Sequence, residues 1–378
     1  MKRKLFILFV VSIGLTWLQG CGEDDYPVPP ASTVPKFSYA IDNDEFAPAT
    51  VTFTDESIIP ERAGEVSYLW NFGDGTSSAV TDPEHRYEMP GVYKVNLVIV
   101  TSESLEINES TQTIVIKDPN ASGTPVYFTN GSTVFTALIN EQEPVVTSIG
   151  ITTLQDSYGM AIDTVNDKLY IADFDGQKIL VADLDGKNLK DFRTNIGEPD
   201  AVAIDYTNNQ LYWDTSNGIR RANMDDPALG QYEDFVTGQP NDPEGMSIDP
   251  VNGRLYWNNY DGGVWRKNLN GTGETEIVPG GQGGGSIIVI GNKIYFDEYI
   301  ASGDIYLKSA NLDGTGVATI ATGISRLVYG IAYDQYEDKI YWVDRNKSTI
   351  MRANLDGSAA EPWYTGTSAR GLVIGKNK

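Results

Sequence analysis

Tyrosine recurs at nearly even intervals along the C-terminal part of this 378-residue chain. The recurring tyrosines lie 43, 42, 44, 39 and 46 residues apart, at Tyr127, Tyr170, Tyr212, Tyr256, Tyr295 and Tyr341. A short polar turn and a second strand-like segment follow most of them, and that segment often ends in Leu-Asp-Gly or Leu-Asn-Gly. A catalytic site needs its residues once, whereas a unit repeated six times builds structure.

The repeat predicts the fold of this region. A unit of about 42 residues made only of short strands is typical of a β-propeller blade, so six copies predict six blades. The first copy begins directly on its tyrosine strand, at residues 126–128, and the chain ends on a small apolar segment at 371–374. Because these two fragments complete one blade, the sequence predicts that the C-terminal segment is the innermost strand of the first blade and closes the ring.

A different pattern precedes the repeats. Residues 50–55, 66–72, 91–100 and 110–116 alternate between apolar and polar side chains, as strands with one buried face do. Asp74-Gly75 supplies the positive φ of a tight turn between two of them. The whole chain is therefore predicted to be all-β, with a β-sandwich at 36–118 and a propeller at 124–378.

Both regions resemble known families. The segments WNFGDG (70–75), PEHRY (83–87) and PGVY (90–93) resemble the PKD domain, an immunoglobulin-like sandwich, although that family usually has Asp where Asn71 stands. This resemblance implies a spacer or adhesion module. The segments YWDT (212–215), YWNN (256–259) and YWVD (341–344) resemble the YWTD propeller of the low-density-lipoprotein-receptor family. That family's partner identities are not carried over, because its animal members have disulfide-rich modules that a chain with one cysteine cannot form.

The N-terminus has the features of a bacterial lipoprotein. Residues 1–20 combine a basic start with a short apolar stretch, as a signal peptide does, and Cys21 follows Leu-Gln-Gly in a sequence that resembles a lipobox. We expect Cys21 to be lipidated and residues 21–35, rich in proline, to form an extended tether. The acidic triplet after Gly22 resembles an export signal of Bacteroidota lipoproteins, which implies anchorage in the outer membrane, facing the cell exterior.

Composition narrows the function. The chain has 52 acidic and 28 basic residues, so nucleic acid is not an expected partner. It contains one cysteine and one histidine, His85, which lies outside the repeats. These counts leave no Cys/His pair and no histidine-rich metal site in the propeller. We therefore expect neither a cofactor nor a metal, and no enzymatic activity.

Residues that differ between repeats at one equivalent position are the candidate binding residues. The residue just before each first strand of a blade is expected to line one mouth of the central channel. These positions hold aromatic, acidic and basic side chains, and the predicted binding face is Tyr158, Asp200, Glu244, Tyr329 and Arg370, with Gly285 at the sixth position.

The sequence thus predicts a non-catalytic surface binding or adhesion protein that takes a glycan or a protein partner at the propeller face, with the PKD domain as spacer. Two alternatives stay open. One is a propeller hydrolase or lactonase that uses Asp200 and Glu244, since a carboxylate pair can hydrolyse glycosides at a suitable separation. The other is a structural subunit of an outer-membrane complex.

Overall fold

The computed structural model describes residues 32–116, 123–140, 144–239, 241–280, 283–301 and 304–377, which form two compact units. The predicted signal peptide, the lipidation site Cys21 and residues 22–31 of the predicted tether lie outside the described residues. No helix in the described ranges has the length and apolarity needed to cross a bilayer.

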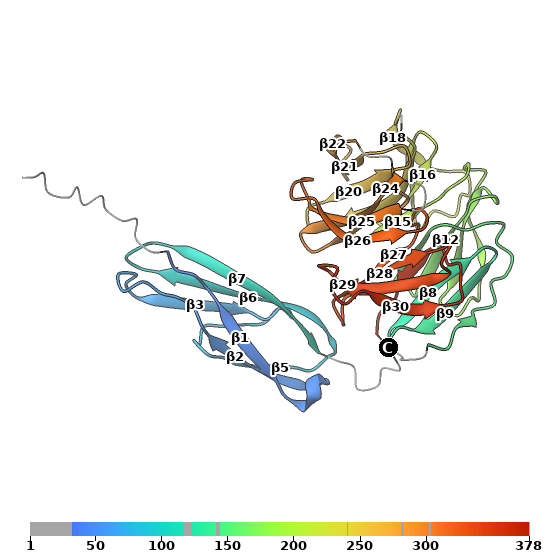
Figure 1. Cartoon of the computed structure of the whole chain (residues 1–378). Helices are drawn as coiled ribbons and strands as arrows, with labels where there is room; N and C mark the ends of the chain where they lie inside the picture. Colours follow the sequence, from blue (N-terminus) through green and yellow to red (C-terminus); the bar gives the residue numbers. More distant parts are fainter. Residues whose placement is uncertain are drawn as a thin grey trace, which may run out of the picture. The chain divides into compact units, whose positions relative to one another are not determined.

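The first unit is a sandwich of two antiparallel sheets, drawn in blue and cyan in Figure 1. One sheet has the order β1-β2-β5, and the other β4-β3-β6-β7. The strands are β1 (Phe37–Ile41), β2 (Ala49–Asp55), β3 (Val66–Asn71), β4 (Ser77–Ser78), β5 (Glu84–Tyr87), β6 (Gly91–Thr101) and β7 (Ile107–Ile116), with a 3-10 turn η1 (Asn43–Glu45). Trp70 is fully buried between the sheets, with its ring centroid 5.0 Å from that of Phe37 and 5.2 Å from that of Phe53.

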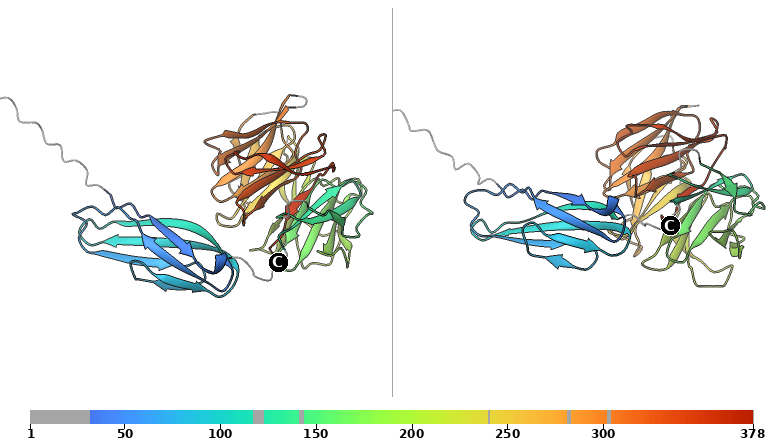
Figure 2. Two further views of the ribbon diagram at one scale, coloured as in Figure 1. Left: turned by 60° about the horizontal axis from the view of Figure 1, so that its bottom comes forward. Right: turned by 90° about the horizontal axis from the view of Figure 1, so that it is seen from below.

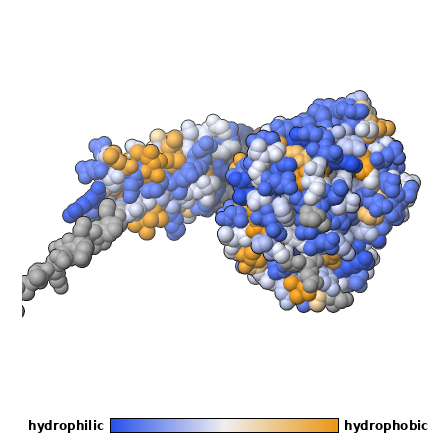
Figure 3. Space-filling model, turned by 90° about the horizontal axis from the view of Figure 1, so that it is seen from above, coloured by the Kyte–Doolittle hydropathy of each residue, from blue (hydrophilic) through white to orange (hydrophobic). Residues whose placement is uncertain are grey.

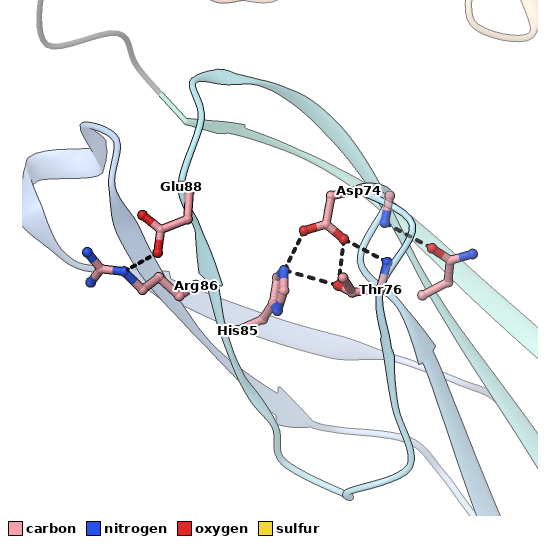
Figure 4. A network of polar contacts seen from close by, with 7 residues as sticks. Asp74, Thr76, His85, Arg86 and Glu88 are labelled. Carbon is pink, nitrogen blue, oxygen red and sulfur yellow. Dashed lines mark hydrogen bonds and ion pairs between the residues drawn. The ribbon is translucent and has the colours of Figure 1, made fainter.

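His85 belongs to the sandwich's own packing. Its ring stacks on Phe72 at 4.1 Å, and its Nε2 lies 2.7 Å from a carboxylate oxygen of Asp74. Figure 4 shows the ring turned toward Asp74 and Thr76, and Thr76 donates to Asp74 from both its backbone N–H and its hydroxyl. Burial alone would raise the pKa of Asp74, but the hydrogen bonds from Thr76 and His85 bring it below its ordinary value.

We expect Asp74→Asn to destabilise the sandwich by about 1 kcal/mol at pH 7, a small effect because the pair is partly exposed. Since the folded-state pKa of Asp74 is lowered, its contribution is present above the ordinary pKa and is lost as pH falls through the lowered value. The difference between variant and wild type should therefore shrink at pH 3. Trp70 is the sole tryptophan of residues 32–116. Urea unfolding of that segment, followed by tryptophan fluorescence, therefore measures the free energy of unfolding of the sandwich. Glu61→Gln, an exposed neutralisation, is the control, and an equal deficit at both pH values would contradict the prediction.

The second unit consists, within its described residues, of six four-stranded antiparallel sheets. Figures 1 and 2 show them in green through red. We call one strand at the edge of each sheet its first strand. Five of these strands begin a repeat, and the sixth lies at the end of the chain: β11 (Met160–Asp163), β15 (Val202–Asp205), β19 (Pro243–Asp249), β23 (Ile287–Ile290), β27 (Ile331–Asp334) and β31 (Leu372–Ile374). The tyrosine strands pair with them: β12 (Lys168–Asp173), β16 (Gln210–Thr215), β20 (Arg254–Asn259), β24 (Lys293–Ala301), β28 (Lys339–Asp344) and β8 (Pro125–Asn130).

Two further strands complete each sheet. The third strands are β13 (Lys178–Asp183), β17 (Gly218–Asn223), β21 (Val264–Asn268), β25 (Asp304–Asn311), β29 (Thr349–Asn354) and β9 (Thr133–Leu138). The fourth are β14 (Lys190–Thr194), β18 (Glu233–Thr237), β22 (Thr275–Val278), β26 (Ala318–Ile324), β30 (Glu361–Thr365) and β10 (Thr147–Ser148).

The first and last strands of the second unit belong to the same sheet. Its order is β10-β9-β8-β31, and Leu372, Val373 and Ile374 pair with Phe128, Tyr127 and Val126. The first strands also contact one another in a cyclic order, β11 to β15, β19, β23, β27 and β31, and β31 contacts β11. Figure 1 shows the C-terminus near the green strands β8 and β9.

The Tyr-Trp pair of the repeat explains how neighbouring sheets pack against each other. Successive side chains of a strand point to opposite faces, so Trp213 and Tyr212 enter two different interfaces. Trp213 packs in one cluster with Tyr170 of the preceding sheet, and Tyr212 packs in another with Trp257 of the following sheet. The six repeated tyrosines are all at most 6% exposed. Burying rings of this size stabilises the sheets by about 1.5–3 kcal/mol each, so the repeated motif is structural.

Candidate functional site

In several sheets an aspartate at the third or fourth position of the tyrosine-strand motif holds the loop that enters the first strand. Asp173 accepts hydrogen bonds from the backbone N–H groups of Gln155 and Asp156, at 2.7 and 3.2 Å. In the next sheet Asp214 accepts from Asp200 and Ala201, at 3.1 and 2.7 Å. In these two sheets a buried carboxylate therefore holds the backbone of the loop that leads into the first strand.

Asp297 performs this role most completely. One of its carboxylate oxygens accepts from the N–H groups of Gly285 and Ser286, both at 2.9 Å, and the other accepts from Val328 N–H at 2.8 Å. It thereby joins the entry loops of two sheets. Burial raises the pKa of Asp297 to about 7, while these three N–H groups oppose the rise. Gly285, at the sixth predicted position, contributes backbone here and has no side chain to offer a ligand.

The predicted aromatic and basic residues come together. The ring centroids of Tyr158 and Tyr329 lie 4.7 Å apart, and the Arg370 guanidinium carbon lies 4.6 Å from the centroid of Tyr158. Arg370 also forms an ion pair with Asp156. Arg345, which the sequence did not single out, lies 4.6 Å from the Tyr329 centroid and 5.7 Å from that of Tyr158. The two tyrosines and two arginines form the aromatic and basic side of the site.

A pocket of about 560 Å³ lies beside this cluster, and we call it the mouth pocket. Four of the five predicted residues line it, namely Tyr158, Asp200, Glu244 and Tyr329. Arg370 is not among its lining residues and reaches the site through its contact with Tyr158. The other lining residues are Phe174, Gln177, Asn195, Ile196, Gly197, Glu198, Asp214, Thr215, Ser216, Asn217, Arg220, Tyr232 and Asp242.

The acidic side of the mouth pocket is buried. Glu244 is 5% exposed, and burial followed by the charges of Asp200 and Asp214 raises its pKa well above the ordinary value. Burial, then the charges of Asp242 and Glu198, raises the pKa of Asp200 to about 7. The pKa of Asp214 is also raised well above its ordinary value, by burial and then by Asp200. These carboxyl groups therefore repel one another and resist ionisation.

An apolar channel of about 340 Å³ is lined mainly by the first strands, with Met160, Val202, Met246, Ile287, Ile331 and Leu372 among its residues. Tyr329 lines both this channel and the mouth pocket, so the two spaces meet at its side chain. Burial raises the pKa of Tyr329, and its hydroxyl stays neutral there. Across the described residues, no three His, Cys, Asp or Glu side chains group as a metal ion would need.

Sequence reasoning missed Arg345, Asp214, Phe174 and Asp242. Arg345 directly follows the motif residue Asp344, and Asp214 belongs to the YWDT segment itself, so the repeat pattern assigns both to the structural framework. A comparison of the residue that follows each tyrosine strand would have separated Arg345 from its counterparts. No local feature of the sequence indicates how deeply these charged side chains are buried.

Residues 33–116 match the family model of the PKD domain, which confirms the predicted PKD sandwich. Collagenase ColA of Bacillus cereus is 39% identical over 72 residues, which are 19% of this chain and 8% of the collagenase. Since the chain spans so small a share of that enzyme and the match concerns the PKD part, it supports neither the presence nor the absence of catalysis.

The solved structures extend the comparison to the repeats. A crystal structure of a nidogen/laminin complex aligns with a TM-score of 0.60 at 16% identity, covering 68% of this chain and 100% of that one. TolB from Acinetobacter baumannii aligns with a TM-score of 0.56 at 11% identity, covering 75% and 79%. At these identities the likeness concerns the fold alone. The protein is therefore an all-β chain with a PKD domain and β-propeller-like structural neighbours.

Proposed function

We propose that this chain is a non-catalytic binding protein whose ligand enters the mouth pocket. One observation carries the proposal: residues that share their place in the repeat, at the start of different first strands or just before them, converge on a single pocket of about 560 Å³. Pockets of several hundred Å³ with aromatic walls and a few fixed polar groups are the usual form of a small-ligand site.

The architecture proposed behind this site is a six-bladed propeller of YWTD type, closed by β31. The six four-stranded sheets of the described residues, the pairing of β31 with β8 and the cyclic contacts of the first strands support it. A closed ring holds the mouth residues of all six repeats around one axis, which is why distant positions in the sequence serve one ligand.

A glycan is the proposed ligand. The mouth pocket offers the rings of Tyr158, Phe174 and Tyr329 together with amide and hydroxyl groups on its lining. Sugars present apolar ring faces and many hydroxyl groups, and such walls match both. Figure 3 shows one face of the second unit as mainly hydrophilic, with apolar residues scattered over it. A protein partner is the alternative ligand class.

The proposed localisation is the outer membrane, with the lipid of Cys21 as anchor and the folded domains facing the cell exterior. Its support is the N-terminal sequence, a basic and apolar leader followed by the sole cysteine. The PKD domain then serves as a spacer between the anchor and the binding unit.

A second candidate function is hydrolysis by the carboxyl pair Asp200 and Glu244. The raised pKa values of both groups favour it, since a general acid must hold its proton near neutral pH. A metal-dependent lactonase has less support, because no three His, Cys, Asp or Glu side chains of the described residues are grouped closely enough to hold a metal ion. The two functions differ in whether the ligand survives binding.

Calorimetric titration of residues 22–378 against a panel of oligosaccharides tests the proposal. We expect Tyr158→Ala/Tyr329→Ala to weaken binding at least tenfold, about 1.4 kcal/mol, because the two rings form one wall of the mouth pocket. Tyr260→Ala is the matched control, since Tyr260 is 44% exposed and lies outside that lining. Ligand recovered intact supports binding without catalysis, and hydrolysed ligand supports the second candidate. Undiminished binding by the double variant would place the site elsewhere.

A further inference from the structure

The lining of the mouth pocket is strongly unbalanced in charge. Its acidic residues are Glu198, Asp200, Asp214, Asp242 and Glu244, and its basic residue is Arg220. Arg220 is already engaged, since its Nε donates to Asp234 at 3.0 Å and its Nη1 donates to the carbonyl of Ile196 at 2.9 Å. The pocket therefore faces an incoming ligand with an excess of carboxyl groups.

The nearby arginines offset only part of this excess. Arg370 is paired with Asp156. Arg345 is buried against the rings of Tyr158 and Tyr329, and its charge acts on Asp200. Glu244 interacts most strongly with further carboxyl groups, those of Asp200 and Asp214.

Glu244 is the exceptional member of the set. It is 5% exposed and lines the mouth pocket, yet its Oε2 has no hydrogen-bond partner among the described residues. The neighbouring buried carboxylate of Asp214, by contrast, accepts two backbone N–H groups. Leaving a buried carboxyl oxygen without a donor destabilises the folded chain, so a feature of this kind is expected where a ligand supplies the missing donor.

We infer that the mouth pocket binds an amino sugar, an oligosaccharide whose protonated primary amine donates to Glu244 and Asp200 while its rings lie against Tyr158 and Tyr329. This inference rests on the proposed function and names the ligand class within it. An ammonium group brings three donors and a positive charge, which satisfy Glu244 Oε2 and relieve the repulsion between the two carboxyl groups.

The geometry favours an organic cation attached to a sugar over two other cations. A metal ion needs several ligands at about 2.0–2.6 Å, and the carboxyl groups of the described residues do not group in that way. A lysine side chain alone would leave most of a 560 Å³ pocket unfilled, together with its amide and hydroxyl groups. A charged sugar uses the carboxyl groups, the aromatic rings and the polar lining at once.

A pair of probes that differ in their amino groups tests the inference. Residues 22–378 are titrated calorimetrically with a β-1,4-linked glucosamine tetrasaccharide and with its fully N-acetylated form, at one pH and low salt. We expect the free-amine probe to bind at least tenfold more tightly. Glu244→Gln should remove that preference, and Glu337→Gln, which neutralises an exposed acid outside the pocket, should retain it. Thermal unfolding of each variant checks that it is folded.

The outcomes distinguish a failure of the amino-sugar inference from a failure of the proposed glycan-binding function. Equal affinity for the two probes, or a preference that survives Glu244→Gln, overturns the inference and leaves glycan binding in place. If neither tetrasaccharide nor any oligosaccharide of the panel binds, the glycan proposal itself fails. A lysine-containing peptide that binds in a Glu244-dependent manner, while the sugars do not, overturns the amino-sugar assignment in favour of a protein partner.

Discussion

Deletion of residues 371–378 is expected to lower the unfolding free energy of the second unit by at least about 5 kcal/mol. The deletion removes β31, whose residues Leu372 and Ile374 pack with the largest apolar cluster of that unit. It also removes the backbone pairing with β8 and the bond from Gly371 N–H to the hydroxyl of Thr129 at 3.0 Å. A loss of this size approaches the whole stability of an ordinary domain.

The consequences reach beyond one strand. Without β31, the strand β8 presents unpaired backbone groups at an open sheet edge, and the contacts with β27 and β11 are lost. We therefore expect the truncated chain to aggregate at concentrations where the intact chain is soluble, since such edges pair with other chains.

Guanidinium unfolding followed by intrinsic fluorescence measures this effect. Deletion of residues 377–378 alone is the control, because it leaves β31 intact. A synthetic peptide of residues 369–378, added in trans, should restore part of the lost stability by adding the strand back to the edge, and a scrambled peptide should not. A truncated chain that unfolds within about 1 kcal/mol of the intact one would contradict the proposed closure.

The sequence predicted the mouth residues through their place in the repeat. Tyr158, Asp200, Glu244 and Tyr329 are 42, 44 and 85 residues apart, yet they line one pocket. Three of them precede first strands, and Glu244 lies at the start of β19. A repeat carries this information, since equivalent positions in equivalent units occupy equivalent places. Likewise, the alternation of residues 66–72 predicted β3, because a strand with one buried face must alternate.

The chemistry of the pocket was less predictable. Glu244 was expected just before its first strand, but it is the second residue of β19, because that strand begins earlier than its counterparts. Nothing in its local sequence indicates that it is only 5% exposed. The groups whose charges or pKa values are coupled to it, Tyr329, Asp200 and Asp214, come from other parts of the chain. Arg345 illustrates the same limit, since its place over Tyr329 is decided by the packing of two loops. Tertiary contacts of this kind leave no periodic signal.

The buried carboxyl groups predict that stability falls as pH rises from about 4 to about 8. The pKa values of Asp200 and Asp297 are raised to about 7, and those of Glu244 and Asp214 are raised well above their ordinary values. Between the unfolded and folded pKa values the folded chain binds more protons than the unfolded chain, so removing protons favours unfolding. Groups with lowered pKa values, such as Asp74, act in the opposite direction at lower pH.

Asp200→Asn isolates one contribution to this trend. Raising a carboxyl pKa from its ordinary value to about 7 corresponds to a loss of roughly 4 kcal/mol in unfolding free energy once the group is ionised. Because the repulsion is shared with neighbouring acids, a single substitution restores only part of that free energy. We expect the variant to be more stable than the wild type by about 1–3 kcal/mol at pH 8 and nearly equal to it at pH 4.5, where Asp200 is protonated in the folded chain. Guanidinium midpoints at the two pH values measure the difference, with Glu337→Gln as the control for removing one exposed charge. A neutral side chain at position 200 should also weaken the site inferred for an amino sugar. If the variant is more stable at pH 8 and binds the glucosamine tetrasaccharide less tightly, the carboxyl groups serve binding at a cost in folding stability. A variant less stable than the wild type at pH 8 would instead mean that Asp200 stabilises the folded loops, as Asp214 does.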